Sequence, residues 1–167
     1  LGERRFYVKD GMLLSNCVAE IDGTYFGFSE EGVMYRDSVF TIVRFDENNA
    51  YTYRADKDGA LYVKKWYTSE DGKTYYYGEQ GREAEGFCEI DGKNYLFEST
   101  GEQYRDCQVL YKGENYYCAK NGEATLLSNN RWTMADGMYY YVKDGHVCRD
   151  CVEAINGQYY GFRETGA

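Results

Sequence analysis

The chain has 167 residues, with 19 Lys and Arg against 28 Asp and Glu, a formal net charge of −9 and a mean hydropathy of −0.72. This acidic balance disfavours nucleic acids and anionic membrane surfaces as partners, and no apolar run is long enough to span a bilayer. Aromatic residues nevertheless make up 18% of the chain, and 20 of these residues are Tyr, which argues against disorder. The chain starts without Met or a signal sequence and stops at Gly166-Ala167 where another repeat is due, so we expect an excised piece of a longer protein.

The first half of the chain is predicted to form β-hairpins. Residues 5–8 form a returning strand followed by a loop at residues 9–11, and residues 18–28 form the first full hairpin around Asp22-Gly23. A longer, atypical repeat then runs from residue 40 through a four-residue turn at residues 46–49. Trp66 and Tyr67 lead into the next hairpin, whose turn contains Asp71-Gly72.

Residues 86–101 are the clearest copy of the unit. Residues 87–90 form a strand, Asp91-Gly92 supplies the positive φ values of a type I′ turn, and residues 93–97 run back to a polar loop that Gly101 closes. Three further hairpins follow, with turns at residues 112–113, 136–137 and 156–157. No helix is expected, because turn residues recur too often.

The loop glycine recurs with a spacing of about 21 residues, at Gly11, Gly32, Gly59, Gly81, Gly101, Gly122, Gly145 and Gly166. The fold class is therefore predicted to be all-β, a β-hairpin solenoid of about eight ~21-residue repeats in which each hairpin is stable only against its neighbours. A single array is expected over residues 1–167, with repeats near 1–16, 17–37, 38–64, 65–85, 86–105, 106–130, 131–150 and 151–167.

Aromatic residues occupy two columns of this alignment. Six residues before each loop glycine stand Arg5, Phe26, Tyr53, Tyr75, Tyr95, Tyr116, Tyr139 and Tyr160, and four before it stand Tyr7, Phe28, Ala55, Tyr77, Phe97, Cys118, Tyr141 and Phe162. Residues two apart on a strand face the same side, so the columns predict an aromatic ladder and a thin, continuous core. A slower period overlies the first, since residues 6–11 reappear at residues 140–145 and the two Trp are 66 residues apart.

Residues 90–97 (IDGKNYLF), with copies at residues 21–28 and 155–162, resemble the cell-wall-binding repeat superfamily. That group includes choline-binding repeats, the glucan-binding repeats of glucosyltransferases and the C-terminal repeats of clostridial toxins. The resemblance covers essentially the whole chain and implies a solenoid of rotated hairpins, displayed on or secreted from a Gram-positive bacterium. It also implies that longer repeats help to form carbohydrate sites. Choline-binding repeats use several Trp per site, whereas this chain has only Trp66 and Trp132, so the resemblance favours a glycan.

Exposed rings in the lengthened repeats are the candidate glycan contacts, because an aromatic face can cover the apolar C–H face of a sugar. The aromatic candidates are Tyr51, Tyr53, Trp66, Tyr67, Tyr116, Trp132 and Tyr139, and Arg131 is the candidate donor to sugar hydroxyls. The competing interpretation is that these rings belong to the core of the ladder.

The six cysteines allow 15 disulfide connectivities. Cys17, Cys107 and Cys151 share an alignment column with Ser38 and Gly86, which favours small, buried, free thiols. Cys148 and Cys151 have the spacing of half a zinc site, but no second pair matches it, so we predict neither a metal nor a cofactor.

The function predicted from the sequence is a non-catalytic carbohydrate- or cell-wall-binding module of a bacterial surface or secreted protein. Its partner would be a cell-wall polysaccharide or a host glycan. One alternative is an adhesin or scaffold that binds a host protein such as an immunoglobulin, or self-associates through open solenoid ends. Another is a passive spacer. An enzyme is disfavoured, because no pair of carboxylates is arranged for glycoside hydrolysis and His146 stands alone.

Overall fold

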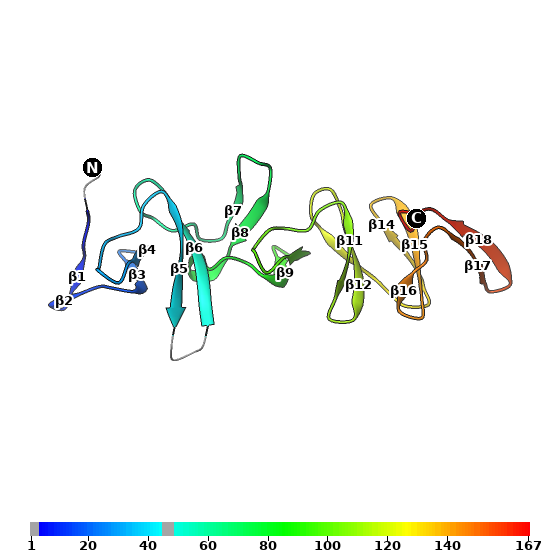
Figure 1. The fold of residues 1–167 in the computed structure, drawn as a ribbon, viewed down its shortest axis with the longest axis horizontal. Coiled ribbons are helices and arrows are strands. Elements are labelled where there is room, and N and C mark those ends of the chain that lie inside the picture. The colour runs from blue at the N-terminus through cyan, green and yellow to red at the C-terminus, as the bar shows by residue number, and fades with distance from the viewer. Residues whose placement is uncertain (1–3, 45–48) are drawn as a thin grey trace. The chain divides into compact units, whose positions relative to one another are not determined.

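A computed structural model describes residues 4–44 and 49–167 (Figure 1). The described chain is all-β, as predicted, apart from one 3-10 turn, η1 (Glu79–Gly81). It divides into two compact units, Leu1–Ala84 (unit 1) and Glu85–Ala167 (unit 2), and each unit is treated by itself.

Unit 1 is a series of antiparallel hairpins. Their strands are β1 (Val8–Lys9), β2 (Met12–Leu13), β3 (Cys17–Ile21), β4 (Thr24–Phe28), β5 (Ser38–Arg44), β6 (Asn49–Ala55), β7 (Lys65–Thr68) and β8 (Thr74–Tyr77). They pair in sequence order, β1 with β2 and so on to β7 with β8. The predicted turn at residues 46–49 falls mostly on residues 45–48, outside the described residues.

Unit 2 continues the pattern with additional strands. Its elements are β9 (Gly86–Ile90), β10 (Lys93–Phe97), β11 (Cys107–Tyr111), β12 (Glu114–Cys118), β13 (Ala124–Leu127), β14 (Trp132–Ala135), β15 (Met138–Lys143), β16 (His146–Val147), β17 (Cys151–Ile155) and β18 (Gln158–Phe162). The sheets β11-β12-β13 and β14-β15-β16 are three-stranded, whereas β9-β10 and β17-β18 are simple hairpins.

The two-residue turns form as the sequence predicts. In β9-β10, Ile90 pairs with Lys93 across Asp91 and Gly92, whose φ values are 51° and 74°. Both angles are positive, which is the requirement of a type I′ turn. The turns at residues 22–23, 112–113, 136–137 and 156–157 have the same signs of φ. The turn that contains Asp71 is longer, since Thr68 pairs with Thr74.

The loop after each hairpin closes on a glycine and then returns to the array. The Gly32 N–H donates to the carbonyl of Ser29 (2.9 Å), and the loops closed by Gly59, Gly81, Gly101, Gly122 and Gly166 repeat this contact. In unit 1, the segment after Gly59 bridges two hairpins, because Leu61 pairs with Ala55 while Ala60 pairs with Phe26. Backbone hydrogen bonds therefore join successive repeats as well as strands within a hairpin.

Two of the predicted loop glycines are hairpin-turn glycines instead. Asp10-Gly11 joins β1 to β2, and Asp144-Gly145 joins β15 to β16, with positive φ at all four residues. The predicted alignment, which treats Gly145 as a loop glycine, is therefore shifted by one residue in β15. Tyr140 and Val142 are buried, whereas Tyr139 is 60% exposed, because a one-residue shift moves a side chain to the other face of a strand.

The aromatic columns supply most of the remaining core. Phe28, Ala55, Tyr77, Phe97, Cys118 and Phe162 are all buried. The buried residues form small clusters between neighbouring strands, such as Phe40, Ile42, Tyr53, Ala55 and Leu61 in unit 1, and not the single continuous core that was predicted. Each hairpin is thus stabilised by its neighbours, because it is too thin to bury its own apolar face.

Candidate ligand-binding site

Trp132 is the centre of an aromatic surface site in unit 2. It is the first residue of β14, where it pairs across the strands with Tyr141, and their ring centroids are 5.2 Å apart. Its indole is 39% exposed although other rings surround it. Trp132 therefore contributes to packing while it keeps part of its aromatic face accessible.

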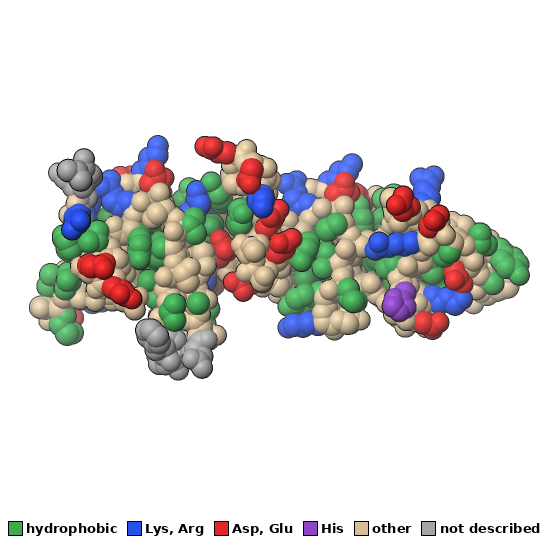
Figure 2. All heavy atoms as spheres, viewed as in Figure 1, with side chains coloured by type: hydrophobic (Ala, Val, Ile, Leu, Met, Phe, Trp, Pro, Cys, Tyr) green, Lys and Arg blue, Asp and Glu red, His purple; other side chains and the backbone are tan. Residues whose placement is uncertain are grey.

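The next hairpin completes the surroundings of Trp132. Tyr160 meets the indole edge-on at 4.9 Å between centroids, and Phe162 stacks on it at 5.7 Å with an interplanar angle of 18°. Both rings come from β18, where residues two apart face the same side. The hairpins β14-β15 and β17-β18 therefore meet through an aromatic contact, and Figure 2 shows hydrophobic side chains at the surface over β17-β18.

A cleft of about 360 Å³ opens beside this contact, and its size falls within the range of small-molecule sites. Its lining residues are Trp132, Met138, Tyr139, Tyr160, Gly161, Phe162, Arg163 and Ala167. The Tyr160 hydroxyl donates to the Gln158 carboxamide oxygen (2.7 Å), so its own oxygen can still accept a hydrogen bond. The cleft combines flat apolar rings with a few polar groups.

Gly161 lies between the two rings of β18, but it faces the other side of the strand, together with the exposed Val152 and Tyr159. Gly161 therefore borders the cleft through its backbone. A Cβ placed on Gly161 would meet no atom within 4 Å, whereas one on Gly27, the corresponding residue of the first full hairpin, would fall 2.1 Å from Phe40 of the following hairpin.

Unit 1 presents a different aromatic surface. Trp66 pairs across the strands with Tyr76, with ring centroids 4.8 Å apart, and is 36% exposed. The opposite face of the same hairpin carries cations. Tyr67 pairs with Tyr75 and faces away from Trp66, and Tyr62 contacts Tyr67. The Arg54 guanidinium lies 3.6 Å from the centroid of Tyr67, and the Lys65 ammonium lies 4.1 Å from that of Tyr62. These cation–π contacts occupy one face of each of the two tyrosines.

Two of the predicted contact residues lie in the core. Tyr53 is 3% exposed and stacks on Phe40, and Tyr116 is 9% exposed and donates its hydroxyl to Glu114 (2.9 Å). Burial, together with that hydrogen bond, raises the pKa of Tyr116. A buried ring presents no face to a ligand, so the expectation that these two tyrosines form surface contacts is corrected.

The remaining predicted residues are divided between the units. Tyr51 and Tyr67 of unit 1 are half-buried, each beneath an arginine, and the Arg82 guanidinium lies 3.9 Å from the centroid of Tyr51. Trp132 and Tyr139 meet in the cleft of unit 2, whereas the exposed Arg131 does not line it. The sequence prediction missed Tyr160, Phe162 and Arg163. The first two stand in the ladder columns, which was the available signal for them.

Two other grooves are more polar. One, in unit 2, is lined by residues that include Asn115, Asn129 and Gly145, and the Asn115 amide donates to the Gly145 carbonyl (2.8 Å). The other, in unit 1, is lined by residues that include Glu30, Glu31 and Tyr35. Neither lining contains a pair of aromatic rings, so the Trp132 cleft is the stronger candidate for a sugar ring.

None of the six cysteines, all of which lie in the described residues, forms a disulfide; Cys118 and Cys148 are buried and the other four are half-buried. Cys107 pairs with Cys118 across β11-β12, and burial raises the pKa of the Cys118 thiol to about 12. Gly86 explains why their column needs a small residue, because a Cβ there would fall 2.5 Å from the Tyr111 hydroxyl. Among residues 4–44 and 49–167, no group of three or more His, Cys, Asp or Glu could hold a metal.

The chain is similar in sequence and fold to choline-binding-like repeats of the cell-wall-binding type. A family model described as the choline-binding repeat matches residues 84–132. The described residues contain no helix with the length and hydrophobicity of a bilayer-spanning segment.

Several known proteins are similar to the chain. Glucosyltransferase-S of Streptococcus mutans serotype c is 29% identical over 99% of this chain, which spans only 11% of that enzyme. Choline binding protein F of Streptococcus pneumoniae, solved in the presence of a peptidoglycan analogue, has a TM-score of 0.60 at 18% identity, covering 97% of this chain and 54% of that one. The choline-binding domain of CbpL from the same species has a TM-score of 0.52 at 18% identity, covering 90% and 75%. At these identities the structural matches establish the fold.

Proposed function

We propose that this chain is a non-catalytic carbohydrate-binding module of a bacterial surface or secreted protein, and that the Trp132 cleft contacts cell-wall polysaccharide. The observation that carries the proposal is the partly exposed Trp132 indole, supported by Tyr160 and Phe162 beside an open cleft. A sugar ring would lay its C–H face on these aromatic rings.

Polar groups at the edge of the cleft would then orient the sugar. Tyr139 is 60% exposed and lines the cleft, so its hydroxyl can donate to or accept from a sugar hydroxyl. The Tyr160 oxygen can accept, because its proton is already donated to Gln158. Such a shallow site binds weakly by itself, and a polymer gains affinity by contacting several repeats at once.

The related proteins support this proposal. The name of Glucosyltransferase-S refers to glucose transfer, and the structure of choline binding protein F was determined with a peptidoglycan analogue. Both come from streptococci, which is consistent with a position outside a Gram-positive cell. The chain spans only 11% of Glucosyltransferase-S, so the proposal concerns binding and not the catalysis of that enzyme.

Removing a supporting ring tests the proposal. Tyr160→Ala removes a ring that contacts Trp132 and lines the cleft. Tyr159→Ala is the matched control, because Tyr159 faces the other side of β18, is 80% exposed and does not line the cleft. Calorimetric titration with soluble glucan, cell-wall polysaccharide and host oligosaccharides should show binding by the wild type and the control, and weakened binding by Tyr160→Ala. Binding of no glycan at millimolar concentration would refute the proposal, as would unchanged binding by Tyr160→Ala.

A further inference from the structure

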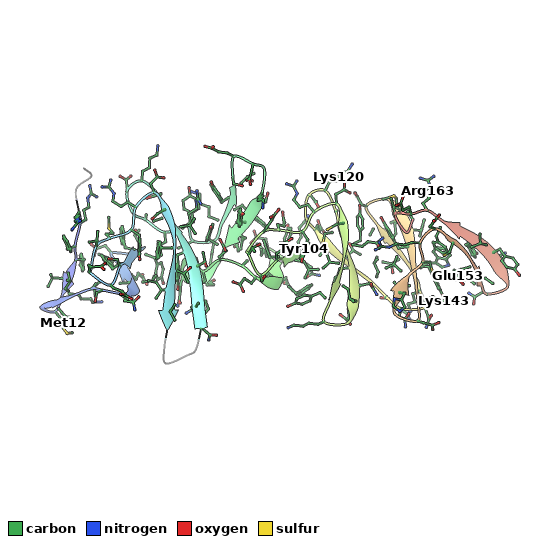
Figure 3. The ribbon with its side chains drawn as sticks, viewed as in Figure 1. Met12, Tyr104, Lys120, Lys143, Glu153 and Arg163 are labelled. Carbon is green, nitrogen blue, oxygen red and sulfur yellow. The ribbon has the colours of Figure 1, made fainter. Side chains whose placement is uncertain are left out.

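The charge around the Trp132 cleft is uneven. Arg163 has the only charged side chain among the residues that line it. Arg163 follows Phe162, the last residue of β18, and Figure 3 labels its side chain. A ligand in the cleft would therefore meet Arg163 as well as the aromatic rings.

The backbone of Arg163 is fixed. Its N–H donates to the Ala167 carbonyl (3.0 Å), while its own carbonyl accepts from Gly166 (2.8 Å) and from Asp150 (3.1 Å). These bonds belong to the glycine-closed loop that recurs along the chain. The root of the side chain is thus held in place, and only the flexible stem must order on binding.

The guanidinium of Arg163 is also available. Across residues 4–44 and 49–167, it forms no ion pair and lies over no ring. Other arginines contact protein groups: Arg36 and Arg105 donate to backbone carbonyls, Arg149 donates to the Gln108 side chain, and Arg54 and Arg82 lie over tyrosine rings. Arg163 is therefore a donor without a partner in the described part of the protein.

From this geometry we infer that the cleft selects a saccharide that carries an anionic group, with Arg163 as the residue that binds the anion. The inference depends on the proposed function, because it assumes that the sugar ring lies on Trp132. Guanidinium presents paired N–H donors that match a carboxylate or a phosphate. The net charge of −9 opposes an anion at long range, but at physiological ionic strength distant charges are screened beyond about 8 Å. The adjacent guanidinium also disfavours a quaternary ammonium, although the aromatic rings would suit one.

Matched ligands test this selection. The wild-type chain is titrated at pH 7 and 0.15 M salt with glucose, glucuronic acid, glucose 6-phosphate and choline, and the Trp132 indole N–H signal is followed by NMR. We expect at least one of the two anionic sugars to bind about twofold to fivefold more tightly than glucose, which is the range of an exposed ion pair. Choline should bind most weakly. Comparison of the two anionic sugars distinguishes a uronic acid from a phosphorylated sugar.

Variants assign the effect to the guanidinium. Arg163→Gln should remove the preference while changing glucose affinity by less than about twofold, and Arg163→Lys should keep part of it. Arg149→Gln is the control, because Arg149 already contacts Gln108, and it should keep the full preference. Equal affinities for glucose and both anionic sugars would overturn the inference and leave the proposed function standing. Absence of binding by every sugar would overturn both.

Discussion

The two tryptophans occupy comparable positions in hairpins, yet their surroundings differ. Trp66 and Trp132 each lie in the first strand of a hairpin, pair with a tyrosine across the strands and are 36% and 39% exposed. In unit 1, Arg54 and Lys65 lie over Tyr67 and Tyr62, on the face of β7-β8 opposite to Trp66. In unit 2, within the described residues, no cation lies over Trp132, Tyr160 or Phe162, and a cleft opens beside them.

Exposure of an indole alone does not distinguish the two surfaces. In unit 2, the hairpin β17-β18 adds Tyr160 and Phe162 beside Trp132, and a cleft opens there. In unit 1, Trp66 packs on Tyr76, and the cation–π contacts lie on the other face of the hairpin. The rings that the following hairpin contributes are therefore the feature that marks the Trp132 cleft as the candidate site.

The largest expected effect concerns the core that the units share. Tyr53→Ala in unit 1 and Tyr140→Ala in unit 2 each remove a buried ring, and each should lower the free energy of unfolding by about 3–5 kcal/mol. Tyr159→Ala is the control, since Tyr159 is 80% exposed and its replacement should change stability by less than about 0.5 kcal/mol. Urea unfolding measures all three. A cost below about 1 kcal/mol at either buried tyrosine would show that the units do not have equivalent cores.

The next effect separates the two tryptophans directly. Trp132→Ala should weaken glycan binding at least tenfold, because it removes the central ring of the cleft. Trp66→Ala should change it by less than about twofold. Affinity electrophoresis in gels that contain glucan compares both variants with the wild type. Equal losses in the two variants would remove the distinction between the units.

Alkaline pH tests a buried tyrosine of unit 1. Burial, and then a hydrogen bond to Glu83 (2.8 Å), raises the pKa of Tyr77 above its usual value of 10.0. The folded state therefore keeps its proton longer than the unfolded state, so the stabilisation is complete below pH 10 and declines as the pH rises above it. The free energy of unfolding should fall more steeply between pH 9 and pH 11 (approximate bounds around the unfolded value) in the wild type than in Tyr77→Phe. Identical slopes would contradict the assignment.

The smallest effect distinguishes two arginines. Arg54→Ala should lower stability by about 0.5–1 kcal/mol, because its guanidinium lies on Tyr67. Arg163→Ala should leave stability within about 0.5 kcal/mol. Thermal unfolding of both variants provides the measurement, and a larger loss for Arg163 than for Arg54 would reverse the roles assigned to them.

Much of the fold follows from local chemistry that a sequence displays. Asp91-Gly92 and its copies specify two-residue turns, and the spacing of Gly32 and its equivalents gives the repeat. The glycine spacing alone places Gly145 among the loop glycines. In the structure Asp144-Gly145 forms the hairpin turn between β15 and β16, whereas Gly32 and its equivalents close loops. That single difference reverses which of Tyr139 and Tyr140 is buried.

The candidate site was less predictable, because it depends on contacts between repeats. Trp132 and Tyr139 could be selected as large rings in a lengthened repeat, but Tyr53 and Tyr116 satisfied the same criterion and are buried. The tyrosine face that Arg54 covers, and the position of Phe40 against Gly27, depend on three-dimensional packing between hairpins.

The most direct test of the central claim uses the fact that the chain has only two tryptophans. An NMR spectrum of the uniformly 15N-labelled chain contains one indole N–H signal from each, and Trp66→Phe assigns them. Titration with a soluble cell-wall tetrasaccharide should move the Trp132 signal progressively and leave the Trp66 signal in place. Movement of the Trp66 signal alone, or of neither signal at saturating ligand, would contradict the account.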